Sequence, residues 1–352
     1  MFIYIIIGIL MFGFLIFIHE LGHFIAARKC GVGVYEFAIG MGPKIFSHTG
    51  KDSVIYSLRL LPIGGFVSMH GEDDDAIGAS DETSLAKKSI GARFAVISAG
   101  AVMNILLGII VSLLVVIFAG NLYSTTIERF NFGDENGNLI PMTEYQGLEI
   151  GDEIIKIGNR RVNIRHDLVY EAMRISDTPT SLTVIRDGEK ITVENFVFPV
   201  SVQKGIKFGN ANFFMPTRLE KTVPEVFKQT FCQAAAVMRM IWSSLIDTIG
   251  GKYGTEALSG PVGVVGEMKE TAEKGGASAL VYLFMVLTLN LGIINLLPIP
   301  ALDGGRLFFL LIEFIRKKPL NPKFEGALNF AFLMLLMLLM VFITVKDIAK
   351  IF

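Results

Sequence analysis

The residues best suited to chemistry in this chain are His19, Glu20 and His23, which follow a run from Met1 to Ile18 without a charged side chain. Residues four apart on an α-helix share a face, so the two imidazoles can point at one ion. Zinc suits imidazole nitrogen, and at a site with an open position it lowers the pKa of bound water from about 15.7 to about 7. Glu20 is placed to take a proton from that water. The H-E-x-x-H pattern therefore predicts zinc-dependent hydrolysis, and the alternative is a polar helix end at a membrane surface.

A second segment can complete such a site, because catalytic zinc usually has three protein ligands and one open position. In NLGIINLLPIPALDGGRL, from Asn290 to Leu307, an apolar helix runs into two prolines and then Asp303 followed by two glycines. Proline breaks helices and paired glycines permit tight turns, so a sharp break there would let Asp303 face inward. The alternative is an ordinary helix end with a capping aspartate.

The composition indicates that a membrane must hold these segments. Of the 352 residues, 52% are hydrophobic and only 18% are charged, against about 25% charged in ordinary soluble domains. The net charge is −1, and no stripe of Lys and Arg with interleaved aromatics is present, which argues against a nucleic-acid partner. Cys30 and Cys232 are too few and too far apart for a disulfide framework or a thiolate metal site.

Four apolar segments are long enough to cross a bilayer: residues 1–27, 94–120, 275–302 and 326–346. The first has neither a positive start nor a small-residue cleavage site, so we expect it to be retained and not removed as a signal peptide. The predicted fold class is an α-helical polytopic membrane protein with four transmembrane helices. Lys and Arg concentrate in the connections 28–93 and 303–325, which the positive-inside rule places in the cytoplasm. Both termini and the long segment 121–274 are then extracytoplasmic.

One further segment, residues 222–249 within the expected linker 201–274, has apolar residues at helical spacing. They are Phe227, Phe231, Met238, Trp242, Leu245 and Ile249. Charged residues such as Glu225 and Arg239 interrupt this pattern. We expect an amphipathic helix at the outer membrane interface, in contact with lipid. The alternative is a fifth span, which would invert one end of the topology.

Four motifs, in this order along most of the chain, resemble the site-2 protease family of intramembrane zinc proteases, and within it the bacterial group typified by the regulator of sigma-E protease. They are HELGH, LPIGGFVSM (Leu61 to Met69), SAGAVMN (Ser98 to Asn104) and NLLPIPALDGG (Asn295 to Gly305). The resemblance implies that His19, His23 and Asp303 bind one Zn²⁺ per chain and that Glu20 is the general base. It also implies a bacterial cytoplasmic (inner) membrane. The distribution of Lys and Arg places the active site near the cytoplasmic side of that membrane.

A transmembrane substrate must unwind before cleavage, and its freed backbone groups then need partners, because unpaired ones in lipid cost several kcal/mol each. Residues Lys51 to Met69 contain β-rich runs around a Pro and Gly turn, which predicts a hairpin that could add the substrate as a strand. The resemblance implies the same role for a membrane-associated sheet. The resemblance places Gly65, Phe66 and Val67 on its edge. The alternative is a plain cytoplasmic hairpin.

Three asparagines lie within apolar helices, where a buried amide must find a hydrogen-bond partner. Each can contact the substrate backbone or tie helices together. We expect Asn295, inside the matched motif, to contact substrate, and Asn104 is a further candidate for that role. For Asn290 we expect helix packing.

The extracytoplasmic segment 121–200 has the composition of a soluble domain. Its Asp187-Gly188 pair between alternating apolar runs predicts a hairpin, and PMTEYQGLEIGDEIIKIGNRRV resembles the central part of a PDZ domain. Such an inserted α+β domain binds peptides by strand addition, or it filters substrates by size, the other role that the family implies. The acidic segment Gly71 to Thr83 is expected to be a solvated loop and not a calcium site.

These observations predict an intramembrane zinc endopeptidase that cleaves single-span membrane proteins. The substrates that the family implies are membrane-bound anti-sigma factors and remnant signal peptides, and an upstream site-1 type protease would first shorten the substrate. The chain carries one PDZ-like segment where the sigma-E type usually carries two. The alternative function is a catalytically silent membrane adaptor that holds client proteins through this segment, and a tethered protease for soluble peptides is a third.

Overall fold

A computed structural model of the chain describes residues 2–71, 82–132, 142–203, 206–251 and 259–349. The chain divides into two compact units, each of which is described by itself. One comprises residues 1–111 and 241–352, and the other comprises residues 112–240. Most of the acidic segment 71–83 lies outside the described residues. The solvated loop expected there therefore falls outside them too.

Helices dominate the first unit. They are α1 (Phe2–Lys29), the larger part of α2 (Ile90–Phe118), α5 (Pro261–Asn295), α6 (Asp303–Arg316) and α7 (Pro322–Ala349). Within the described residues, four helices are long and apolar enough to cross a membrane: α1, α2, α5 and α7. None of the most apolar stretch of α7 is buried inside the protein. This pattern is expected where lipid and not protein covers a helix, and it fits the polytopic membrane protein predicted from composition.

The helix α5 is shorter at its carboxyl end than the expected span 275–302. It leaves helical geometry at Gly276 (φ 63°) and ends at Asn295, because Pro298 and Pro300 cannot continue the hydrogen-bond ladder of a helix. The connection 303–325, expected as a loop, contains the 14-residue helix α6. No proline interrupts that helix, and the left-handed conformation of Lys317 (φ 54°) ends it.

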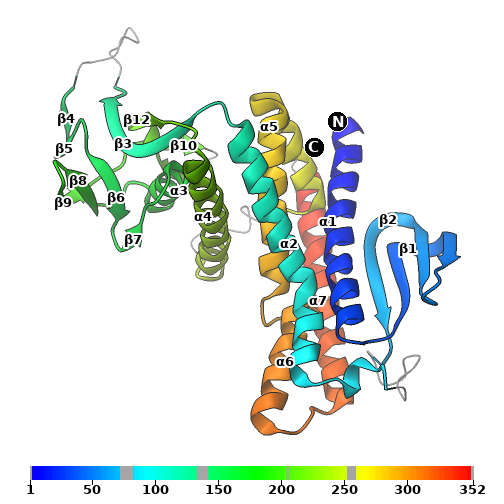
Figure 1. Cartoon of the computed structure of the whole chain (residues 1–352). Helices are drawn as coiled ribbons and strands as arrows, with labels where there is room; N and C mark the ends of the chain where they lie inside the picture. Colours follow the sequence, from blue (N-terminus) through cyan, green and yellow to red (C-terminus); the bar gives the residue numbers. More distant parts are fainter. Residues whose placement is uncertain (1, 72–81, 133–141, 204–205, 252–258, 350–352) are drawn as a thin grey trace. The chain divides into compact units, whose positions relative to one another are not determined.

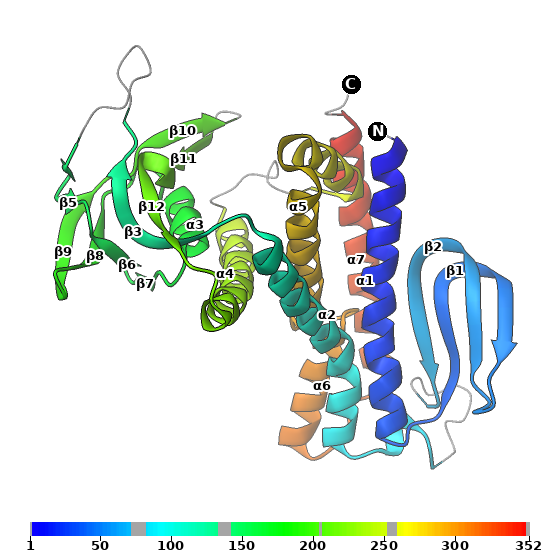
Figure 2. The ribbon, with the colours of Figure 1, turned by 45° about the horizontal axis from the view of Figure 1, so that its top comes forward.

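A sheet of two long strands, β1 (Val34–Thr49) and β2 (Ile55–Met69), lies beside α1 (Figures 1 and 2). The prediction that the two β-rich runs of residues 51–69 pair with each other is wrong. Both runs pair with the first part of β1 instead, since Ala38 pairs with Phe66 on one side and with Ser57 on the other. Aromatic rings of α1 pack on the sheet, and Phe24 meets Phe37 with ring centroids 5.3 Å apart.

The segment 65–69 of β2 forms an edge of this sheet. Its residues pair with the first part of β1, and no other strand among the described residues pairs with it. The end of α1, the beginning of α2 and α6 all lie at one end of the helical bundle (Figures 1 and 2). An ion pair between Arg93 of α2 and Glu313 of α6 joins two of these helices there. This end therefore carries the segments that hold His19, His23 and Asp303.

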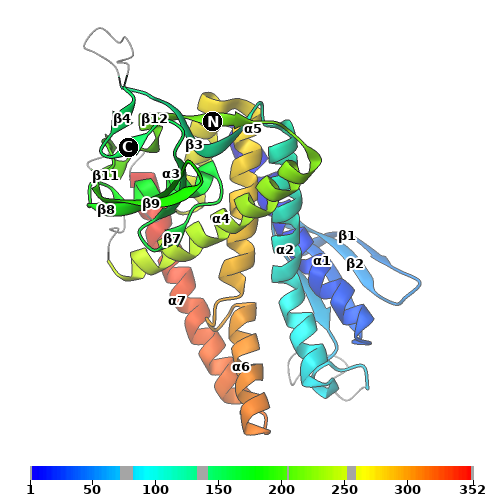
Figure 3. The ribbon, with the colours of Figure 1, turned by 60° about the vertical axis from the view of Figure 1, so that its left-hand side comes forward.

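The second unit is built on a sheet with strand order β12-β3-β6-β8-β9, and β7 pairs with β6. Its main strands are β3 (Leu122–Phe130), β6 (Glu153–Ile157), β8 (Thr180–Arg186), β9 (Glu189–Phe196) and β12 (Phe214–Leu219). The shorter ones are β4 (Glu144–Tyr145), β5 (Leu148–Glu149), β7 (Arg160–Arg161), β10 (Val200–Gln203) and β11 (Ile206–Gly209). Helix α3 (Arg165–Ile175) packs against β3 and β11 (Figure 3).

The predicted hairpin at Asp187-Gly188 is confirmed, because β8 and β9 pair and both turn residues have positive φ. The sheet includes β12 and so continues to Leu219, which makes the expected domain boundary at residue 200 too early. The segment 222–249 forms one helix, α4 (Val223–Ile249), which is not among the four helices of the described chain that could span a membrane. Its Phe227 and Phe231 are exposed while Gln229 is buried, an arrangement that suits a lipid surface.

Candidate metal centre

His19 and His23 lie one turn apart on α1, and the helix directs both imidazoles to the same side. Their Nε2 atoms are 3.2 Å apart, and their rings meet edge to face with centroids 4.8 Å apart. Both residues are buried. The four-residue spacing therefore places two imidazole nitrogens where they can share one ion.

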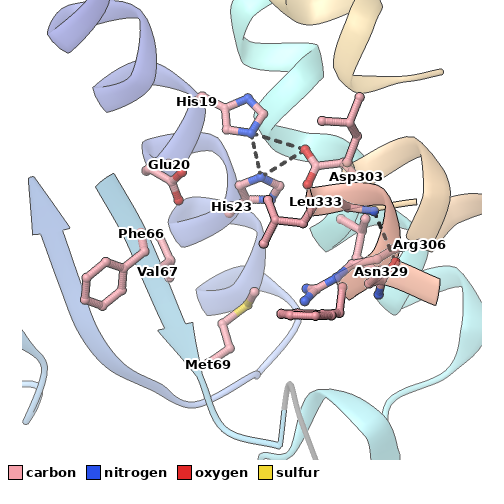
Figure 4. Close-up of a pocket in the computed structure, with 14 residues that line it drawn as sticks. His19, Glu20, His23, Phe66, Val67, Met69, Asp303, Arg306, Asn329 and Leu333 are labelled. Atoms are coloured by element: carbon pink, nitrogen blue, oxygen red, sulfur yellow. Dashed lines mark hydrogen bonds and ion pairs between the residues drawn. The ribbon is translucent and has the colours of Figure 1, made fainter. Parts of the chain in front are cut away.

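Asp303 reaches the same point from the first turn of α6. Its Oδ2 atom lies 3.2 Å from Nε2 of His19 and 3.3 Å from Nε2 of His23 (Figure 4). The segment 296–302 folds back on this turn so closely that a Cβ on Gly304 would lie 2.1 Å from the carbonyl oxygen of Leu297. A glycine directly after Asp303 is thus required for the break that aims the carboxylate inward.

The three atoms fit a zinc ion. Zinc bonds of about 2.0–2.1 Å in tetrahedral directions place ligand atoms roughly 3.3 Å apart. The three separations here are 3.2, 3.2 and 3.3 Å. Burial by itself would raise the pKa of Asp303, but the two imidazoles beside its carboxylate lower that pKa below its ordinary value. The carboxyl group is therefore kept in the ionised form that binds metal.

A cavity of about 480 Å³ opens beside these three groups. Glu20 lines it on the α1 side, and Phe66, Val67 and Met69 line it on the edge of the sheet (Figure 4). Gly65 packs directly on Glu20, since a Cβ on this glycine would lie 3.2 Å from Cγ of the glutamate. The glutamate, the ligand atoms and the sheet edge thus share one space.

Comparison with known proteins accounts for this arrangement. The family described as peptidase family M50 matches residues 7–339 of the chain. The chain belongs to peptidase family M50. The zinc metalloprotease RasP of Geobacillus kaustophilus is 31% identical to this M50 peptidase over 98% of the chain and 97% of the relative. The regulator of sigma-W protease RasP of Bacillus subtilis is 30% identical over 98% of each protein, and a Clostridium perfringens relative is 35% identical over 98% of each. The protein is a zinc metalloprotease of the site-2 type.

Two polar residues of the M50 cavity are not among the site residues predicted from the sequence. Arg306 of α6 and Asn329 of α7 both line it (Figure 4). Arg306 follows Asp303 by three residues, about one helical turn, so the spacing alone could have placed it on the same face. Asn329 accepts a hydrogen bond from the backbone N–H of Ala301 at 3.1 Å and so braces the break before Asp303. No local pattern in the sequence indicates that contact.

Two asparagines of the M50 peptidase lie outside the cavity wall. Asn295 ends α5 and is half-buried, but it is not among the residues that line the cavity. Asn104 is fully buried in α2, and its Nδ2 lies 3.4 Å from Nδ1 of His19. The structure therefore brings the sheet edge, and not these amides, to the space beside the ligand atoms.

Proposed function

We propose that this M50 peptidase cleaves peptide bonds within transmembrane segments of single-span membrane proteins, with His19, His23 and Asp303 holding one zinc ion. The observation that carries the proposal is the mutual spacing of 3.2–3.3 Å between the three ligand atoms, which lie beside Glu20 in a protein with four helices apolar enough to cross a membrane among its described residues. Bound zinc supplies Lewis-acid polarisation of the scissile carbonyl and a lowered pKa for the attacking water.

Glu20 acts as the general base in this proposal. It lines the cavity beside the ligand atoms, where its carboxylate takes a proton from the attacking water and passes it to the leaving amine. The same residue therefore serves first as base and then as acid. Its packing against Gly65 limits the directions in which the carboxylate can point.

The substrate binds in an extended conformation along the edge segment 65–69, through the backbone of Gly65, Phe66 and Val67. One side of this segment pairs with β1, and the residues Phe66 and Val67 line the cavity. An unwound substrate that adds as a strand there satisfies the backbone groups that unwinding frees. Asn295 contributes a further polar contact to the substrate near the end of α5, away from the cavity wall.

The substrate class follows from the relatives and from the membrane helices together. The Bacillus subtilis relative is named a regulator of sigma-W protease. On that basis we place membrane-bound anti-sigma factors among the substrates, cut first by an upstream site-1 type protease, and remnant signal peptides as a second group. The enzyme then lies in the bacterial cytoplasmic membrane, with its metal centre near the cytoplasmic side and both termini outside.

The second unit is proposed to be a PDZ-like domain that screens substrates by size. A Cβ on Gly209 of β11 would lie 2.2 Å from the carbonyl oxygen of Ala172 in α3. The hydroxyl of Ser176 also donates to the carbonyl oxygen of Lys207 at 3.1 Å. Because β11 packs this closely on α3, no peptide strand fits between them, which favours exclusion of bulky substrates over capture of a peptide at that place.

The function is tested with purified protein in detergent, by measuring zinc per chain and cleavage of a model transmembrane substrate. We expect Glu20→Gln to keep one zinc per chain and to lose cleavage by at least about 100-fold, since proton transfer contributes roughly 10²–10⁴-fold. Glu189→Gln, at an exposed position of β9, is the matched control and should leave both quantities unchanged. Full cleavage by Glu20→Gln would exclude the general base, and purified wild type without zinc would exclude the metal site.

A further inference from the structure

One face of α2 lies against the two histidines. Val96, Gly100 and Asn104 are spaced by four residues and therefore share that face. The backbone oxygen of Val96 is 2.9 Å from Nδ1 of His23. A Cβ on Gly100 would lie 2.3 Å from Nε2 of His23 and 2.7 Å from Cε1 of His19. Asn104 follows one turn later, beside Nδ1 of His19.

In both imidazoles, Nε2 and Nδ1 have different roles. Each Nε2 faces Asp303, so an ion held there takes the Nε2 lone pairs and leaves the protons on the Nδ1 atoms. Nδ1 of His23 can donate its proton to the carbonyl oxygen of Val96. Nδ1 of His19 needs an acceptor of its own, because a buried N–H without one costs about 1–3 kcal/mol.

Asn104 meets this need through its amide oxygen. The residue is 0% exposed, and its Oδ1 is buried without a hydrogen-bond partner while its Nδ2 faces Nδ1 of His19 at 3.4 Å. The N–H groups of His19 Nδ1 and Asn104 Nδ2 would then face each other, although both are donors. The acceptor Oδ1 of Asn104 would have no hydrogen-bond partner. A rotation of the amide by about 180°, which exchanges two atoms of nearly equal size, places Oδ1 against the N–H of His19.

We propose that Asn104 is a positioning residue of the zinc site: its side-chain oxygen accepts the Nδ1 proton of His19 and fixes the direction of the His19 Nε2 atom. This assignment rests on the proposed zinc ligation by His19. It replaces substrate contact as the role of Asn104, because the residue is fully buried and does not line the cavity. α2 thereby orients both imidazoles, one by a backbone carbonyl and the other by a side chain.

The experiment measures zinc affinity by competition with a chelator on the full-length protein in detergent, without reference to cleavage. Partners of metal-bound histidines typically contribute 10–100-fold in metal affinity. We therefore expect Asn104→Leu, which removes the acceptor at similar volume, to weaken zinc binding by about 10–100-fold. Asn104→Asp restores an acceptor and should bind zinc within a few-fold of wild type. Asn290→Leu, a change of the same kind in α5, is the control and should bind like wild type.

Cobalt substitution adds a readout of geometry, because the visible absorption of bound Co²⁺ responds to the direction of its ligands. We expect Asn104→Leu to shift these bands and Asn104→Asp to restore them. Equal zinc affinity and equal spectra in Asn104→Leu and wild type would overturn the proposal. If Asn104→Leu does not fold, Asn104→Ala serves the same comparison. A His19→Ala variant that keeps full zinc affinity would instead refute the proposed ligation, which distinguishes that failure from failure of the Asn104 role.

Discussion

Gly100 lets α2 approach the metal ligands closely, because it places no side chain between the helix and the two imidazoles. In Gly100→Ala the new Cβ would lie 2.3 Å from Nε2 of His23, a ligand atom of the proposed site. We expect this variant to bind zinc about 10–100-fold more weakly, since the imidazole must turn away or α2 must move. Chelator competition on the detergent-solubilised protein measures the change.

Gly91 supplies the control for this substitution on the same helix. A Cβ there would meet nothing within 4 Å, so Gly91→Ala should keep wild-type zinc affinity. Equal zinc affinity in Gly100→Ala and Gly91→Ala would show that α2 does not constrain the ligands. Weaker zinc binding in both variants would point to a general effect of alanine on the helix.

Residue types and spacing predict which side chains gather at the site better than they predict what supports them. His19 and His23 share a helix face, and a glycine follows Asp303, so the sequence carries a signal for each ligand. The backbone oxygen of Val96 has no such signal, because any residue at position 96 offers the same acceptor. The sequence indicates that Asn104 is a buried amide, but only the structure distinguishes a histidine partner from a substrate contact.

At the scale of elements, the helices are more predictable than the sheet. Spans are set by the length of apolar segments, whereas the pairing of β2 with β1 depends on a partner that contains Gly40, Gly42 and Pro43 and therefore resembles a loop. A local hairpin within residues 51–69 is the simplest expectation. In the structure both β-rich runs instead form backbone hydrogen bonds with the first part of β1, one run on each side of it.

Glu36 ties the segments of this sheet together and makes its stability depend on pH. It accepts hydrogen bonds from Ser57 at 2.6 Å and Arg59 at 2.8 Å, and Lys44 lies 3.0 Å away. Burial would raise the pKa of Glu36, but these partners lower it below its ordinary value of 4.5. Since the folded pKa is the lower one, the stabilisation is present above the unfolded value and is lost as pH falls through the folded value.

We expect hydrogen-exchange protection of β1 and β2 in the wild type to fall as the pH drops below 4.5. Glu36→Gln should already have lost about 1–3 kcal/mol of protection at pH 7 and should show a weaker dependence in the acid range. Comparing the two proteins at each pH cancels effects from protonation elsewhere, the histidines included. If protection falls by the same amount with pH in wild type and Glu36→Gln, Glu36 is not the source of the pH dependence.

For the whole molecule, the charge distribution and α4 together decide the topology. Lys and Arg concentrate in residues 28–93 and 303–325, which favours a cytoplasmic location for both connections. Between Lys190 in β9 and Lys318 after α6, only α5 among the described helices is long and apolar enough to span a membrane. An interfacial α4 therefore leaves these two positions on opposite sides, whereas a spanning α4 would bring them to the same side.

Cysteine labelling in intact cells separates these outcomes. In a chain with Cys30→Ser and Cys232→Ser, we introduce one new thiol at a time, by Lys190→Cys or Lys318→Cys, both at exposed positions. A membrane-impermeant maleimide should label Lys190→Cys in whole cells, and Lys318→Cys only after the membrane is opened. Labelling of both from outside would make α4 a fifth span, and the reverse pattern would invert the proposed orientation. Because Lys318 closely follows the helix that begins with Asp303, its accessibility also reports on which side of the membrane the metal centre lies.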